Sequence, residues 1–196
     1  MPVARAKFAR RGPTAVAGRT ELAACALLLL FATDIGAKNE ATREVIDSIV
    51  IHAIGGPHCN SENKPIFGRV TGDAARWKRY FETDPTLGIH WIIDRSGTTA
   101  ASVPETRVAN YARGANQTSI GIELVNNGDG IDEYPKAQID ALTKLVKEIR
   151  KRWNIPLSSI KRHSDIDGGL PLPCGIARRV DPGPAFPFDA FMKSLM

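Results

Sequence analysis

Three short apolar runs, together with two segments of helical periodicity, constrain the fold of this chain more than any other feature. The runs have the length of strands and are rich in Ile and Val, and they cover residues 47–52, 88–94 and 119–125. The last run alternates Ile and Leu with Ser, Gly and Glu, which is the period of a β-strand. Helical spacing of apolar residues follows Asp73 and Pro135. The sequence therefore predicts an α/β fold, a single domain whose central mixed β-sheet is flanked by helices.

The connections between these elements are predicted from their Gly, Pro and Asn content. Residues 98–103 are expected to pair with 88–94 as a hairpin. A loop is expected over residues 55–70, where Gly, Pro and Asn are frequent. The segment 163–184 contains four Gly and four Pro, and an irregular segment of this length inside a domain usually serves a function.

Charge argues against a nucleic-acid partner. The net charge of the 196 residues is +5, and five basic against two acidic residues within residues 1–37 account for +3 of it. Elsewhere Lys and Arg are interspersed with acidic residues, which is typical of solvated helix faces. Three Cys are too few for a fold that depends on disulfides. We therefore expect a globular domain that binds no nucleic acid.

The N-terminal residues have the order of an export signal. Five basic residues precede an apolar run over residues 22–32, which predicts a leader over residues 1–37 and a folded domain over 38–196. A poor match at the cleavage position leaves membrane anchoring through residues 20–33 as the alternative. Either outcome predicts a periplasmic or secreted domain. Removal of the leader would leave two Cys, which form either one disulfide or two separate thiols.

Several residues that can bind a metal lie at predicted strand ends or in loops: His52, His90, His163, Glu123 and Asp181. A catalytic zinc site needs three protein ligands, an open position for water and a nearby carboxylate that accepts a proton. One His at a strand end is more often structural than metal-binding. The five residues together indicate a metal site more strongly than any one of them does. The sequence motifs that surround them add to this evidence.

Six motifs follow one another along the chain: Ile49-Val50-Ile51-His52, residues 88–97, Ala112-Arg113-Gly114-Ala115-Asn116, residues 119–124, His163-Ser164-Asp165-Ile166 and Asp181-Pro182-Gly183-Pro184. In their order and spacing the chain resembles the type 2 N-acetylmuramoyl-L-alanine amidases over about residues 44–192. That family includes bacterial amidases, phage lysozymes with amidase activity and animal peptidoglycan recognition proteins.

The resemblance implies a role for each matching residue. By it, His52, His163 and Asp181 are ligands of one zinc ion, and Glu123 is the acidic residue that activates water and passes its proton to the leaving amine. Bacterial relatives carry a Lys two residues before the third ligand, where this chain has Arg179. A guanidinium offers the same positive charge, so Arg179 is expected to stabilise the oxyanion.

Other positions are expected to shape the cleft or to be structural. Tyr111 stands where many relatives carry His, and the segment 163–181 is longer than in compact members of the family, which affects the shape of the cleft. His90 is interpreted as structural. His58, in a Gly-Pro loop, is expected to face solvent or to support the ligands at most.

The function that the resemblance implies is hydrolysis, with zinc, of the amide bond between N-acetylmuramic acid and L-alanine in peptidoglycan or muropeptides. A peptidoglycan-recognition module without hydrolysis is the rival from another class, and the presence of Glu123 and Asp181 argues against it. A recycling amidase for soluble anhydro-muropeptides is a further alternative, which export would disfavour. A lytic protein delivered to another cell would share the same domain.

Overall fold

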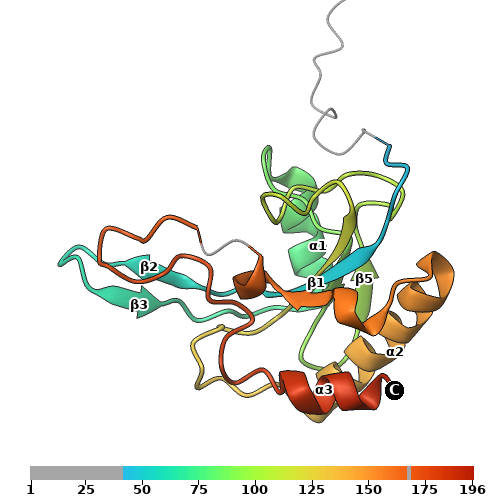
Figure 1. Ribbon diagram of the computed structural model, residues 1–196. Helices are drawn as coiled ribbons and strands as arrows, with labels where there is room; N and C mark the ends of the chain where they lie inside the picture. Colours follow the sequence, from blue (N-terminus) through green and yellow to red (C-terminus); the bar gives the residue numbers. More distant parts are fainter. Residues whose placement is uncertain (1–41, 167–168) are drawn as a thin grey trace, which may run out of the picture. The chain divides into compact units, whose positions relative to one another are not determined.

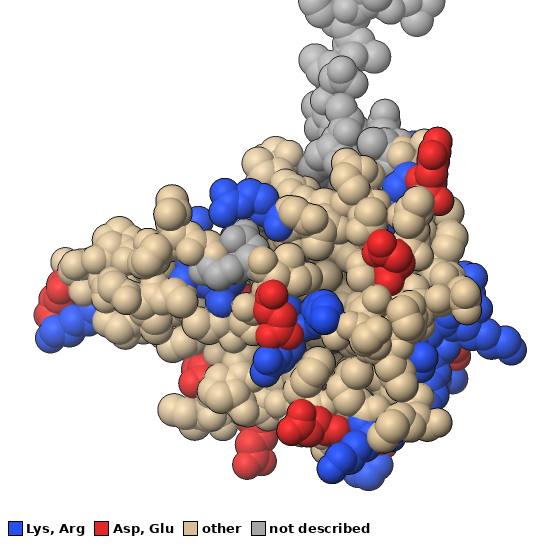
Figure 2. All heavy atoms as spheres, in the orientation of Figure 1, with Lys and Arg blue, Asp and Glu red and all other residues tan. Residues whose placement is uncertain are grey.

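The computed structural model describes residues 42–166 and 169–196. The predicted leader over residues 1–37 and the predicted anchor over residues 20–33 lie outside the described residues. Within the part that is described, no helix is both long and apolar enough to cross a membrane. Figure 2 shows acidic side chains interspersed with basic ones over one face of the molecule.

A five-stranded sheet in the order β5-β4-β6-β1-β7 forms the centre of the fold (Figure 1). Its strands are β1 (Ser48–Ala53), β4 (Trp91–Ile93), β5 (Thr99–Ala101), β6 (Ser119–Leu124) and β7 (Ile160–Arg162). β1 pairs in parallel with β6 and β7, and β6 pairs in parallel with β4. β4 and β5 are antiparallel, as expected for the predicted hairpin. The predicted α/β fold with a mixed central sheet is confirmed.

A second, two-stranded sheet lies where the sequence predicts a loop. β2 (Pro57–Cys59) and β3 (Pro65–Phe67) pair in antiparallel fashion. Asn60 closes the turn between them, because its side chain accepts hydrogen bonds from the backbone N–H groups of Glu62 and Lys64. The prediction of a loop over this segment was wrong. Each strand has only three residues and no apolar alternation, so the sequence carried no strand signal here.

Local sequence explains where the first helix begins and where the second begins and ends. α1 (Ala74–Thr83) starts after Asp73, whose carboxylate accepts a hydrogen bond from the N–H of Arg76 at 2.7 Å. α2 (Lys136–Trp153) follows Pro135 and ends at Asn154, which has the left-handed φ of 54°. α3 (Phe188–Ser194) completes the chain, and two 3-10 turns, η2 (Leu157–Ser159) and η3 (His163–Asp165), flank β7.

The two faces of the sheet are covered differently, as Figure 1 shows. Alternate residues of β1 and β6 pack with α2 and α3 in the main core, which includes Ile49, Ile51, Ile120, Ile122, Leu124, Leu142, Val146, Ile149 and Phe191. On the opposite face, Phe81 of α1 packs with Ile92 of β4. α1 lies against β4 and β5, at one side of the sheet. The carboxyl ends of β1 and β6 on that face are therefore available for a site, which is where α/β sheets usually bind ligands.

Candidate active site and metal centre

Strand register brings His52 and Glu123 together. The two residues are direct partners in the parallel pair of β1 and β6, and Ile92 of β4 is the partner of Glu123 on its other side. Because side chains at paired positions point to the same face, His52 and Glu123 lie on the α1 face of the sheet. The sequence alternation places Glu123 away from the row of Ile and Leu, and the structure confirms this orientation.

His163 and Asp181 lie beside His52, on the side of β1 that is opposite to β6. β7 is the neighbour of β1, and His163 follows β7 directly. The rings of His52 and His163 lie with their centroids 4.3 Å apart. Asp181 is held beside them because its carbonyl accepts a hydrogen bond from the N–H of Ser164 at 3.0 Å.

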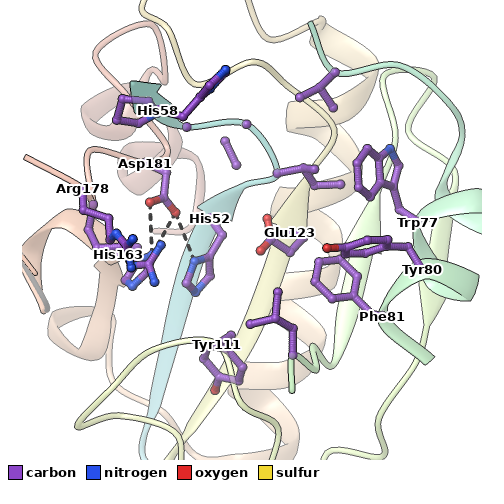
Figure 3. Close-up of a pocket in the computed structure, with 18 of the residues that line it drawn as sticks. His52, His58, Trp77, Tyr80, Phe81, Tyr111, Glu123, His163, Arg178 and Asp181 are labelled. Carbon is purple, nitrogen blue, oxygen red and sulfur yellow. Dashed lines mark hydrogen bonds and ion pairs between the residues drawn. The ribbon is translucent and has the colours of Figure 1, made fainter. Parts of the chain in front are cut away.

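The carboxylate of Asp181 lies between the two imidazoles (Figure 3). Its Oδ2 is 3.1 Å from Nδ1 of His52 and 3.1 Å from Nδ1 of His163. One possible ligand atom from each of the three side chains lies within 4.8 Å of the others. The structure thus gathers three of the residues that the sequence singles out, and it places Glu123 in the same cleft.

Burial sets the electrostatics of this cluster. It lowers the pKa of His52, against the opposing influence of Asp181. Burial would raise the pKa of Asp181, but hydrogen bonds with His163 and His52 hold it well below its ordinary value. Burial and the charge of Asp181 together raise the pKa of Glu123 well above its ordinary value, and the positive charge of Arg179 opposes this.

Three polar atoms in the cluster lack a partner among the described residues. They are Nε2 of His52, Nε2 of His163 and Oε2 of Glu123, all of them buried. Buried polar atoms normally have a hydrogen-bond partner, and exceptions often mark a functional site. Two neutral imidazoles and an ionised carboxylate form the nitrogen and oxygen donor set of a catalytic zinc site. The chemistry of these donors therefore fits a zinc ion.

The cluster lies in a cleft with a volume of about 700 Å³. Figure 3 shows Trp77, Tyr80 and Phe81 of α1 on the side of Glu123, and Arg178 on the side of His163. Arg179 also lines the cleft, and its positive charge acts on the pKa of both His52 and Glu123. The sequence had singled out neither Arg178 nor Tyr80. Arg178 directly precedes Arg179 in the sequence. This pair of basic residues shortly before Asp181 is the sequence feature from which Arg178 could have been predicted to line the cleft.

Tyr111 packs against His52 and does not turn its hydroxyl toward the metal cluster. Its ring stands edge-on to those of His52 and His90, with centroids 5.4 Å apart in each case. The hydroxyl lies 2.7 Å from Oγ of Ser119. Burial raises the pKa of Tyr111 to about 12, so the phenol stays protonated at neutral pH. The residue that stands where many relatives carry His therefore orients a neighbouring ring.

His90 and His58 lie outside the cluster. His90 is fully buried, accepts a hydrogen bond from the N–H of Gly121 at 3.0 Å and lies 3.1 Å from the carbonyl of Arg107. Burial lowers the pKa of His90 to about 4, in agreement with its interpretation as structural. His58 lies on β2, is exposed and lines the cleft.

A disulfide joins the two Cys whose pairing the sequence left open. Cys59 of β2 and Cys174 are bonded, across 115 residues of sequence. Cys174 lies in the irregular segment that also carries Leu172, Arg178 and Arg179, all of which line the cleft. The disulfide therefore connects the β2-β3 sheet to one wall of the cleft.

Comparisons with known proteins agree with this geometry. Residues 42–184 match the sequence profile of a family described as N-acetylmuramoyl-L-alanine amidase. The amidase AmiD of Escherichia coli K12 is 39% identical over 102 residues, which are 44% of this chain and 34% of AmiD. The endolysin of Escherichia phage T7 is 30% identical over 118 residues, 57% of this chain and 71% of the endolysin. The chain thus spans about a third of AmiD and most of the T7 endolysin.

The fold is shared with solved amidase structures. A complex of E. coli AmiD with the substrate anhydro-N-acetylmuramic acid-L-Ala-D-gamma-Glu-L-Lys superposes with a TM-score of 0.58 at 24% identity, covering 79% of this chain and 59% of that one. The amidase LysC of Clostridium intestinale gives a TM-score of 0.53 at 23% identity, over 76% of this chain and 85% of LysC. By the match to its profile over residues 42–184, this chain belongs to the N-acetylmuramoyl-L-alanine amidase family.

Proposed function

We propose that this chain is a zinc-dependent N-acetylmuramoyl-L-alanine amidase. Its reaction is hydrolysis of the amide bond between the lactyl group of N-acetylmuramic acid and L-alanine, in peptidoglycan or in muropeptides. The observation that carries the proposal is a buried carboxyl group, Glu123, next to a buried cluster of His52, His163 and Asp181 within one cleft. Membership of the amidase family supports the choice of bond.

The proposed ligands of the zinc ion are His52, His163 and Asp181. A zinc ion bound there would supply a Lewis acid for the amide carbonyl and would lower the pKa of water. Imidazoles bind a metal in their neutral form, and burial favours that form of His52 because it lowers the pKa.

The proposed role of Glu123 is to take a proton from the attacking water and to deliver it to the leaving amine. Its Oε2 is buried and has no hydrogen-bond partner among the described residues, so it can hold a proton without losing another contact. The raised pKa of Glu123 favours the protonated state that must form midway through the reaction. Arg179 lines the same cleft. Its proposed role is to stabilise the negative charge that develops on the carbonyl oxygen during the reaction.

Hydrolysis is favoured over peptidoglycan recognition without cleavage. A recognition module has no need of a buried, unpaired carboxyl group, which lowers stability by about 1–3 kcal/mol when no partner satisfies it. Glu123 is such a group. A soluble anhydro-muropeptide remains a candidate substrate beside the polymer, because a ligand of that class is named as the substrate in the AmiD complex.

We further propose that residues 1–37 direct the domain, residues 38–196, to the periplasm or the cell exterior. The basic and apolar order of the leader supports this assignment. Fractionation of cells that express the full chain would test it. Recovery of the whole protein in the cytoplasm would contradict export and would favour soluble muropeptides as substrates.

Mass spectrometry of digested peptidoglycan tests the proposed activity. We expect the zinc-loaded protein to release stem peptides that begin with L-alanine, a chelator to abolish release and added zinc to restore it. Glu123→Gln should bind zinc but cleave at least about 100-fold more slowly. His58→Ala, which removes another histidine of the cleft, should retain the zinc. Intact polymer that is bound but never cut by the zinc-loaded protein would favour the recognition module.

A further inference from the structure

A second cavity opens beside the metal cluster. It has a volume of about 370 Å³ and shares Leu172, Arg178 and Arg179 with the main cleft. Its other lining residues are Arg113, Gly169, Leu170, Pro171 and Pro173. The two cavities therefore lie next to each other, with Arg178 and Arg179 at their boundary.

The lining of this cavity is basic. Three arginines contribute to it, and none of the described residues that line it is acidic. Arg178 is exposed and makes no hydrogen bond or ion pair with another described residue. Figure 3 shows Arg178 beside His163, next to the metal cluster. Its guanidinium is thus free to form a bidentate pair with an anionic group of a ligand.

The walls of the cavity are tied to the rest of the fold, although they are irregular. The N–H of Leu172 donates to the carbonyl of Ile176 at 2.9 Å, which closes a turn, and the disulfide joins Cys174 of this turn to Cys59 of β2. The amide of Asn63 in the β2-β3 turn donates to the carbonyl of Pro173 at 3.3 Å. The basic cavity is therefore a defined feature of the fold.

We propose that this basic cavity binds a carboxylate of the stem peptide, with Arg178 as its main partner. The inference rests on the proposed amidase function. The cavity adjoins the cleft of the metal cluster at Leu172, Arg178 and Arg179, and consecutive residues of an extended peptide advance by only about 3.8 Å, so we place the second residue of the stem peptide there. The AmiD substrate has a γ-linked D-glutamate at that second position, and a γ-linkage leaves the α-carboxylate of the residue free. An acidic second residue of this kind is the ligand that the cavity fits.

Paired substrates test the proposal. One is a muramoyl peptide with a free α-carboxylate on its second residue, and the other is the same compound with that group converted to a carboxamide. We expect kcat/KM to be about 10-fold to 100-fold higher for the acid, as for loss of one charge-assisted hydrogen bond. Arg178→Gln should reduce this ratio to near one, and Arg178→Lys should restore part of it.

Arg76→Gln is the matched control, because Arg76 lines the main cleft from α1 but not the second cavity. It should leave the ratio of acid to amide at the wild-type value. An equal loss of the ratio in both variants would show a general effect of positive charge and would overturn the assignment to Arg178. A wild-type protein that does not distinguish acid from amide would overturn it as well.

Equilibrium binding separates this proposal from the proposed catalysis. The tripeptide L-Ala-D-γ-Glu-L-Lys is titrated into full-length protein carrying Glu123→Gln, and the titration is repeated with the α-carboxamide of D-Glu. Tighter binding of the acid by tenfold or more, lost on adding Arg178→Gln, would support the cavity even if no amide bond is ever cut. Equal affinity for the two peptides would refute it, whatever the activity of the enzyme.

Discussion

Gly121→Ala gives a sharp test of how the sheet supports the site. Gly121 lies on β6, two residues before Glu123 and on the same face of the strand. A Cβ atom there would lie 2.6 Å from Cδ1 of Ile89 and 2.8 Å from Cε2 and Cζ of Tyr111. Atoms of carbon do not approach this closely, so either Tyr111 or the strand must move.

The expected cost follows from which of these neighbours can yield. Cδ1 of Ile89 is the end of a flexible side chain, whereas the ring of Tyr111 is fixed by hydrogen bonds of its hydroxyl to Ser119. Overpacking of this kind costs about 1–3 kcal/mol. In a domain of this size the loss lowers Tm by roughly 3–10 °C. Because Tyr111 packs edge-on against His52, its displacement should also weaken the proposed binding of zinc.

Thermal unfolding, followed by circular dichroism with and without zinc, provides the assay. Gly56→Ala is the matched control, since no atom lies within 4 Å of a Cβ at Gly56. Ile89→Val, which removes Cδ1, should recover part of the loss when combined with Gly121→Ala. A Gly121→Ala protein as stable as the Gly56→Ala control would refute the argument that Tyr111 is held rigidly over β6.

Two further predictions concern redox state and pH. Reduction of the Cys59–Cys174 disulfide, which spans 115 residues of sequence, should lower the free energy of unfolding by about 2–4 kcal/mol; Cys59→Ser should match the reduced protein in denaturant titrations, and an unchanged midpoint would contradict the prediction. Burial, assisted by the nearby charge of Arg43, lowers the pKa of His90 to about 4. As pH falls, His90 is therefore protonated in the unfolded chain at a higher pH than in the folded protein. Stability should therefore drop by about 3 kcal/mol between pH 6.5 and pH 4 from this residue, and His90→Gln should show a smaller slope than the wild type.

The main strands and helices could be predicted from local sequence because their signals are local. The β-branched run of β1 and the apolar stripe of α2 can each be recognised from their own residues, without information from the rest of the chain. β7 could not be found in this way, since Ile160-Lys161-Arg162 has a single apolar residue. It is a strand because it pairs with β1, and that pairing joins segments far apart in the sequence.

The candidate site shows the same division. Motif resemblance named His52, His163 and Asp181, and the structure brings their side chains together. Their proximity depends on β7 lying next to β1, which no spacing along the chain reveals. The number of Cys left one disulfide and two separate thiols as alternatives, and nothing in the sequence analysis pointed to Arg178, because both features depend on how the irregular segment folds back across the cleft.

The unequal covering of the sheet explains how a small domain can hold so many buried polar groups. Each unpaired polar atom of His52, His163 and Glu123 costs about 1–3 kcal/mol. The opposite face carries a continuous apolar core between β1, β6 and α2, and burial of each large aliphatic side chain there contributes about 1.5–3 kcal/mol. Because both faces belong to the same strands, the apolar face fixes the register that sets His52 beside Glu123. The stability of the core and the geometry of the site are thus consequences of one alternating pattern.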